Sequence, residues 1–166
     1  MKKHFIHSSF REKLIEHLFI GEMLKRSWRL DDCALEVGRP EVDNSGYDII
    51  LEHNGIIRHV QLKATKKGGR TSRQHIHLSL TKKQSGCVVW IFFDEVTLEL
   101  GPYLFLGGKP GKKLPALAKY KSAKHTKEDS TGVKSERPNL RVVPKANFKI
   151  VKTDGDIWRA LFGNGK

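Results

Sequence analysis

The sequence lacks the long hydrophobic runs, the cysteine pairs and the leader-like start that are typical of membrane and secreted proteins. Its longest unbroken apolar run covers residues 87–93, far short of the ~18–20 residues that a membrane span needs. The first seven residues are basic but contain no apolar segment, so a secretory signal is not expected. Two cysteines, Cys33 and Cys87, are too few for a disulfide framework and indicate buried thiols in a reducing compartment. We therefore expect one soluble, cytoplasmic domain of 166 residues.

Acidic side chains are scarce in the second part of the chain. Residues 1–63 contain ten acidic and ten basic side chains, whereas residues 64–166 contain eight acidic and 21 basic ones. The second part thus carries the whole net charge of +13. Such a one-sided surplus favours a polyanionic partner, because Lys and Arg neutralise phosphates and release counterions. Lysines that only keep the chain soluble would give the same composition.

The patterning predicts an α/β domain with a mixed central β-sheet flanked by helices. A helix is expected over residues 10–27, opened by a capping box in which Ser9 and Glu12 each satisfy a free backbone donor of the other. Residues 109–139 are rich in Lys, Ser, Thr, Gly and Pro, and are expected to form a long basic loop. The other expected elements are strands at 33–38, 75–80, 87–93, 98–106, 140–143 and 148–151, and a final helix that begins near residue 154.

Residues 47–64 carry the signal of a β-hairpin. The Asn-Gly pair at 54–55 favours a two-residue turn, which places Asp48 opposite Gln61. One face of this ladder then carries apolar side chains, at Tyr47, Ile49, Leu51, Val60 and Leu62. The other face carries polar side chains, apart from Ile50, at Asp48, Glu52, His59, Gln61 and Lys63. A slip by one residue would mix the two sets, so the pattern supports this register.

Three side chains on the polar face of the hairpin have the chemistry of a phosphodiester hydrolase. The Asp48 carboxylate and the Gln61 amide oxygen are hard ligands suited to Mg²⁺, which also binds substrate phosphate. Lys63, two residues beyond Gln61, shares their face and can hold an attacking water or neutralise phosphate charge. A solvated face on an amphipathic hairpin would contain the same residue types.

These residues also belong to a family pattern. The runs 48–51 (Asp-Ile-Ile-Leu) and 59–64 (His-Val-Gln-Leu-Lys-Ala) resemble the PD-(D/E)XK nuclease superfamily, in members with Gln in place of the second motif acid. Upstream, Gly21-Glu22 and Pro40 follow the order and approximate spacing of that family's helix glutamate and proline. The resemblance covers about residues 10–65. It implies a restriction-endonuclease-like fold and a Mg²⁺- or Mn²⁺-dependent endonuclease that hydrolyses DNA.

The resemblance also implies roles for individual residues. Asp48 would be the principal metal ligand, joined by the side-chain oxygen of Gln61 and the backbone carbonyl of Leu62. Lys63 would position the nucleophilic water and stabilise the transition state, and Glu22 would reach the metal from the helix. Three further acids stay open: Glu16 in place of Glu22, and Glu41 and Asp43 as auxiliary ligands or solvated loop acids. Because Gln61 carries no charge, a non-catalytic nucleic-acid-binding protein with a nuclease-like fold is the alternative.

Basic residues that follow the candidate site are expected to hold the phosphates that flank the scissile one. They are Lys66, Lys67, Arg70, Arg73, Lys112, Lys113, Lys121 and Lys124. DNA is the expected partner and RNA the alternative. Cutting of a duplex would favour a homodimer, since one such site usually handles one strand, although no coiled-coil signal is present. An interaction domain with no nucleic-acid role, whose lysines simply face solvent, is a third hypothesis.

Overall fold

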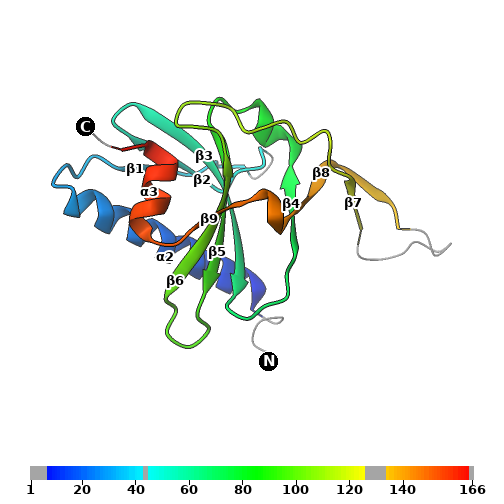
Figure 1. Cartoon of the computed structure of the whole chain (residues 1–166), viewed down its shortest axis with the longest axis horizontal. Helices are drawn as coiled ribbons and strands as arrows, with labels where there is room; N and C mark the ends of the chain where they lie inside the picture. The colour runs from blue at the N-terminus through cyan, green and yellow to red at the C-terminus, as the bar shows by residue number, and fades with distance from the viewer. Residues whose placement is uncertain (1–6, 43–44, 126–133, 165–166) are drawn as a thin grey trace.

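The main β-sheet is mixed and has six strands. A computed structural model describes residues 7–42, 45–125 and 134–164, and its main sheet has the order β1-β2-β3-β5-β6-β9 (Figure 1). Strands β3 and β5 run parallel, and every other neighbouring pair is antiparallel. The bounds are β1 (Glu36–Gly38), β2 (Ile49–His53), β3 (Ile56–Lys66), β5 (Gly86–Phe93), β6 (Leu100–Gly107) and β9 (Lys149–Val151). The expected mixed sheet is confirmed.

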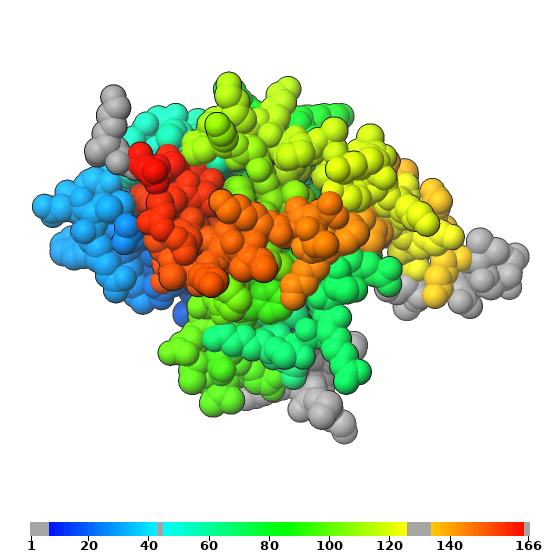
Figure 2. All heavy atoms as spheres, in the orientation of Figure 1, coloured from blue at the N-terminus to red at the C-terminus, as the bar shows by residue number. Residues whose placement is uncertain are grey.

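A second, antiparallel sheet has the order β4-β8-β7. Its strands are β4 (Arg73–His77), β7 (Ser122–Lys124) and β8 (Glu136–Pro144), and a short helix η2 (Lys145–Asn147) leads from β8 to β9. Strand β4 passes into the 3₁₀ helix η1 (Leu78–Lys82), so the strand expected over 75–80 ends at His77. The basic loop expected over 109–139 contains β7 and the start of β8, and its residues 126–133 lie outside the described ranges. Figures 1 and 2 show the β7–β8 ribbon projecting to one side of the body.

The two α-helices of the described ranges pack on one face of the main sheet. Helix α2 (Ser8–Arg29) and helix α3 (Asp154–Phe162) bury apolar side chains in a helix-side core with Ile49, Leu51, Val60, Val89, Ile91, Tyr103 and Phe105. The opposite face packs on the second sheet, on η1 and on a loop segment, through Ile76, Leu80, Val88, Trp90, Leu104, Leu114, Leu117 and Val143. Strand β5 is buried along its whole length, because both faces of the sheet are covered there. Within the described ranges, no helix is both long and apolar enough to cross a membrane.

The hairpin has the expected register. Ile49 pairs with Val60 at one end of the ladder and His53 pairs with Ile56 at the turn. The turn residues, at 54–55, have φ values of 50° and 79°, as the Asn-Gly pair predicts. On the helix-facing side of β3, at a position that the alternating pattern reserves for apolar residues, Arg58 is fully buried.

Three local predictions are wrong. Cys33, expected to be a buried thiol, is exposed, whereas Cys87 is buried as expected. Helix α2 begins at Ser8 with His7 as its N-cap, and no side chain caps it, so the Ser9–Glu12 capping box does not form. Tyr47 lies in the core on the second-sheet side, not on the face of Ile49. Strand alternation begins only at Ile49, and the left-handed backbone of Gly46 (φ 76°) turns the chain just before Tyr47.

Candidate functional site

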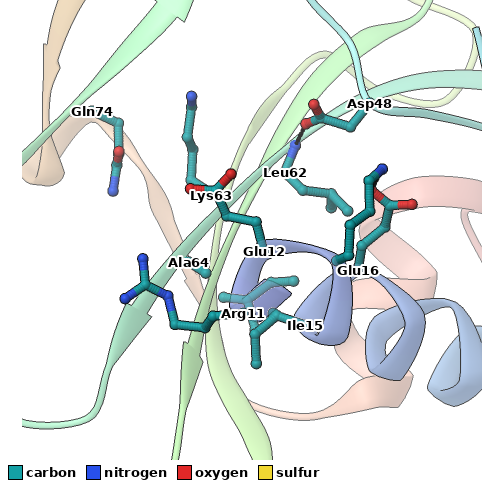
Figure 3. Close-up of a pocket in the computed structure, with 11 residues that line it drawn as sticks. Arg11, Glu12, Ile15, Glu16, Asp48, Leu62, Lys63, Ala64 and Gln74 are labelled. Carbon is teal, nitrogen blue, oxygen red and sulfur yellow. Dashed lines mark hydrogen bonds and ion pairs between the residues drawn. The ribbon is translucent and has the colours of Figure 1, made fainter. Parts of the chain in front are cut away.

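A cavity of about 440 Å³ opens where β3 runs past the end of the hairpin, beside the first turns of α2 (Figure 3). The described ladder between β2 and β3 ends at Val60, whereas β3 continues to Lys66. This step leaves room next to β3 that the N-terminal part of α2 borders. The lining residues are Arg11, Glu12, Lys13, Ile15, Glu16, Asp48, Leu62, Lys63, Ala64, Gln74 and Ile91.

Asp48 is fixed at the open end of the hairpin, opposite the turn, by two hydrogen bonds to β3. Its backbone N–H donates to the Val60 carbonyl (2.9 Å), and its Oδ2 accepts a hydrogen bond from the Leu62 N–H (2.5 Å). The side chain thereby takes up a backbone donor of β3 beyond the end of the ladder (Figure 3). Asp48 and Lys63 both line the cavity, as the hairpin register predicts.

The segment that leads into Asp48 is packed tightly against η1. Ser79 Oγ donates to the Ser45 carbonyl (2.6 Å) and lies 2.6 Å from His77 Nδ1. Gly46 follows in a left-handed conformation, and a Cβ atom there would lie 2.6 Å from the Cβ of His77. The second sheet therefore sets the position from which Asp48 enters the cavity.

Helix α2 brings Glu12 and Glu16 to the cavity, not Glu22. Glu16 is buried, and its carboxylate accepts hydrogen bonds from Lys13 Nζ and Arg39 Nε, both at 2.9 Å. Glu12 is exposed and extends from α2 into the cavity (Figure 3). Glu22 lies ~9 Å beyond Glu16 along the helix axis. It pairs with Lys25 (2.8 Å) and does not line the cavity. Of the two helix acids considered from the sequence, the structure places Glu16 at this position.

Gln61 is turned toward the second sheet. Its side chain is buried, and its Oε1 accepts a hydrogen bond from the His77 N–H at 3.4 Å. Gln61 is not among the residues that line the cavity, although the register places it opposite Asp48. The structure thus brings Asp48, Leu62 and Lys63 together and engages the Gln61 amide oxygen elsewhere.

The oxygen donors of the cavity suit a hard cation that shares its coordination with substrate. Among the described residues, no group of three His, Cys, Asp or Glu side chains is arranged to hold a metal ion. Mg²⁺ is usually bound through one or two carboxylates together with waters and substrate phosphate, without an all-protein cage. Asp48 and Glu12, with the Leu62 backbone beside them, are a donor set of that kind. The Glu16 carboxylate already forms ion pairs with Lys13 and Arg39, so it is less suited to a metal.

The second sheet contributes positive charge next to Lys63. Burial, together with the nearby positive charges of Lys63, Arg137 and Arg73, lowers the pKa of His75 on β4. The charges of Lys63 on β3, Arg73 on β4 and Arg137 on β8 therefore all lie near His75, on the strand that also supplies Gln74 to the cavity. A polyanion bound across this surface would be attracted by all three.

The predicted nucleic-acid-binding residues fall into separate places. Lys66 ends β3 and pairs with Glu95 (2.7 Å), Lys67 and Arg70 follow in the turn to β4, and Arg73 is the first residue of β4. The other four lie further along the chain: Lys112 and Lys113 in an exposed loop after β6, Lys121 just before β7, and Lys124 at the end of β7. Lys67, Arg70 and Arg73 are exposed as well.

Sequence reasoning missed four polar residues of the cavity as site residues: Arg11, Glu12, Lys13 and Gln74. The spacing of Glu12 and Glu16, one helical turn apart, is a signal that would have found Glu12. No local signal points to Gln74, because its place depends on how the second sheet docks. Glu41 is exposed and does not line the cavity, and Asp43 lies outside the described ranges.

Comparisons with known proteins add no assignment. No protein-family model matches this chain, and no curated protein matches it with significant similarity.

Proposed function

We propose that this protein is a metal-dependent endonuclease of restriction-endonuclease-like fold that hydrolyses DNA phosphodiester bonds at the cavity beside β3. The observation that carries the proposal is the shared cavity of Asp48 and Lys63, which lie on the two arms of one hairpin, with Glu12 on the facing helix. An acid, a second acid and a lysine around one space are the groups that phosphodiester hydrolysis requires. The basic second part of the chain supports a polyanionic substrate.

The residues of the cavity would have distinct roles in this reaction. Asp48 and Glu12, with the Leu62 carbonyl, would hold Mg²⁺ or Mn²⁺. When bound, such a cation polarises the phosphate and lowers the pKa of a coordinated water. Lys63 holds the attacking water and places its positive charge against the developing charge on the phosphate. The hydrogen bond from the Leu62 N–H keeps the Asp48 carboxylate in a fixed position at the wall of the cavity.

The test is cleavage of plasmid and branched DNA with and without Mg²⁺. Replacement of Asp48 by Asn or of Lys63 by Ala should lower cleavage by about 100-fold or more, because each removes one charged group from the transition state. Glu12→Gln should also lower it, whereas Glu22→Gln, a matched change outside the cavity, should leave it within about twofold of the unmodified protein. Cleavage that persists in both Asp48→Asn and Lys63→Ala would contradict the assignment.

The alternative is a non-catalytic nucleic-acid-binding protein that retains the same fold. The observation that favours it is the engagement of Gln61 with the His77 N–H, which leaves the cavity without the second motif side chain. This alternative predicts salt-sensitive DNA or RNA binding that is unchanged in Asp48→Asn, and no uptake of Mg²⁺ or Mn²⁺ in calorimetric titrations. Metal uptake that depends on Asp48 would exclude it.

A further inference from the structure

A second hollow, of about 470 Å³, lies directly next to the candidate active-site cavity. The two share Arg11 and Ile15, on the second turn of α2, as part of their walls. The hollow is lined mainly by apolar atoms, and its residues are His7, Phe10, Arg11, Leu14, Ile15, Phe93, Glu95, Val96 and Leu98. Its volume lies within the ~300–1,000 Å³ that is typical of ligand sites.

Two large apolar side chains on its walls face solvent. Phe10, from helix α2, is 71% exposed, and Val96, from the turn between β5 and β6, is 87% exposed. The turn is rigid, because the Asp94 carboxylate accepts hydrogen bonds from the backbone N–H groups of Val96 (2.8 Å) and Thr97 (2.9 Å). Val96 is therefore held at the rim opposite α2 by its own turn, without support from the core.

The charges at the rim suit a nucleic acid. Lys66 pairs with Glu95 at 2.7 Å and so offsets the acid that lines the hollow. Lys67 is the next residue, and its backbone is fixed by a hydrogen bond from its N–H to the Phe93 carbonyl (2.8 Å). Arg11 stands on the wall toward the active-site cavity. An apolar space with basic groups at its edge matches a flat aromatic base joined to phosphates.

We propose that this hollow binds one unpaired nucleobase, stacked on Phe10, of the strand whose neighbouring phosphate lies in the active-site cavity. The inference rests on the proposed function for that cavity and names its substrate class. A base within an intact duplex has its faces covered by its neighbours. The hollow therefore selects DNA with an unpaired base beside the scissile phosphate, as in single strands, bulges, flaps and branch points.

The experiment measures binding without cleavage, in EDTA. Oligonucleotides carry 2-aminopurine, whose fluorescence stacking quenches, either in a one-base bulge or within the matched duplex. The unmodified protein should quench the bulged probe and bind it more tightly than the duplex. Phe10→Ala should weaken binding of the bulged probe by about 5- to 100-fold and leave duplex binding within about twofold. Phe10→Trp should retain the preference.

Trp28→Ala is the matched control. Trp28 is another exposed aromatic residue of α2 (74%), and it does not line the hollow. Replacement of Trp28 should change neither the affinity nor the quenching of either probe. Thermal unfolding of all three variants checks the fold, and Phe10→Ala should unfold close to the unmodified protein because its ring is mostly in solvent.

The outcomes separate this inference from the proposed function. Equal affinity of Phe10→Ala and the unmodified protein for the bulged probe overturns the inference, even if Mg²⁺-dependent cleavage is found. A preference that depends on Phe10 without any cleavage supports the base site and contradicts the hydrolase. A change from dimer to monomer in Phe10→Ala, without a change in base preference, would make the hollow a contact between two copies and overturn the inference.

Discussion

Arg58 is a buried cation that closes the C-terminal end of helix α3. Its guanidinium donates to the carbonyls of Leu161 (2.6 Å), Ala160 (2.9 Å) and Gly108 (3.1 Å). Its charge lies against the negative end of the helix dipole, and its carbon atom Cζ lies 5.8 Å from the Phe105 ring centroid. Burial lowers the pKa of this arginine. One side chain thus joins the hairpin, α3 and the loop after β6.

Replacement of Arg58 should therefore be costly. Arg58→Met keeps much of the side-chain volume but leaves three carbonyls without their donor, so the free energy of unfolding should fall by about 3 kcal/mol or more. Arg159→Met, an exposed change on α3, should cost less than about 1 kcal/mol because it removes only a surface ion pair with Asp156. Urea unfolding measures both. A loss below about 1 kcal/mol in Arg58→Met would mean that the carbonyls find other donors.

At the scale of elements, the hairpin and the second sheet jointly position the candidate catalytic acid. The hairpin supplies the Leu62 N–H that holds the Asp48 side chain, and η1 supports the segment that precedes it. Gly46 is the contact between the two, since its missing side chain lets the backbone approach His77. The position of Asp48 therefore depends on a contact outside the hairpin, between the residue two positions before it and His77 of β4.

Two glycines with left-handed backbone allow this dependence to be tested. Gly46→Ala adds both conformational strain and a Cβ atom within 2.7 Å of Ser79 Oγ, whereas Gly55→Ala adds strain alone, since nothing lies within 4 Å of its Cβ position. Gly55→Ala should lower the free energy of unfolding by about 1–2 kcal/mol, and Gly46→Ala by more. Only Gly46→Ala should also impair Mg²⁺-dependent cleavage. Equal effects of the two variants on cleavage would contradict a positioning role for the Gly46 contact.

The hairpin was predictable from sequence because its information is local. The Asn-Gly turn and the alternation that follows it fix which residues pair, and the structure has that register. The pattern failed at Tyr47, where a bend interrupts the strand, and at Arg58, where an inward charge has partners from distant elements. Gln74 reaches the cavity only through the docking of the second sheet. The choice among Glu12, Glu16 and Glu22 required the position of α2 along the sheet, which helix periodicity alone does not give.

At the scale of the whole molecule, the second sheet extends a basic surface outward from the cavity. Strand β4 supplies Gln74 to the cavity, β8 lies next to it, and β7 forms the outer edge with exposed Lys124 and its neighbour Lys121. In Figure 1, these strands lead away from the main sheet in one direction. A strand of nucleic acid that leaves the cavity along β4 would meet these lysines.

The salt dependence of binding tests this path. The double variant Lys121→Ala/Lys124→Ala should lower the slope of log K against log salt by about 1.8 for duplex DNA, because two phosphate contacts are lost. Lys149→Ala/Lys152→Ala, on β9 and just after it, removes the same charge from an edge strand of the main sheet, outside the second sheet, and should leave the slope unchanged. Equal slopes for the two double variants would mean that the lysines act only through net charge.

The parallel pairing of β3 with β5 has a consequence for the order of folding. A parallel pair needs a long crossover, and here the crossover, residues 67–85, contains β4 and η1. The hairpin can form early because its contacts are local. The crossover must close a longer loop, which costs conformational entropy before its stabilising contacts form. The wall that Gln74 supplies and the support under Gly46 would then form late. A nascent chain would pair β2 with β3 before Asp48 and Gln74 are in place, so Mg²⁺-dependent cleavage should appear in refolding only after the spectroscopic signals of the hairpin are complete.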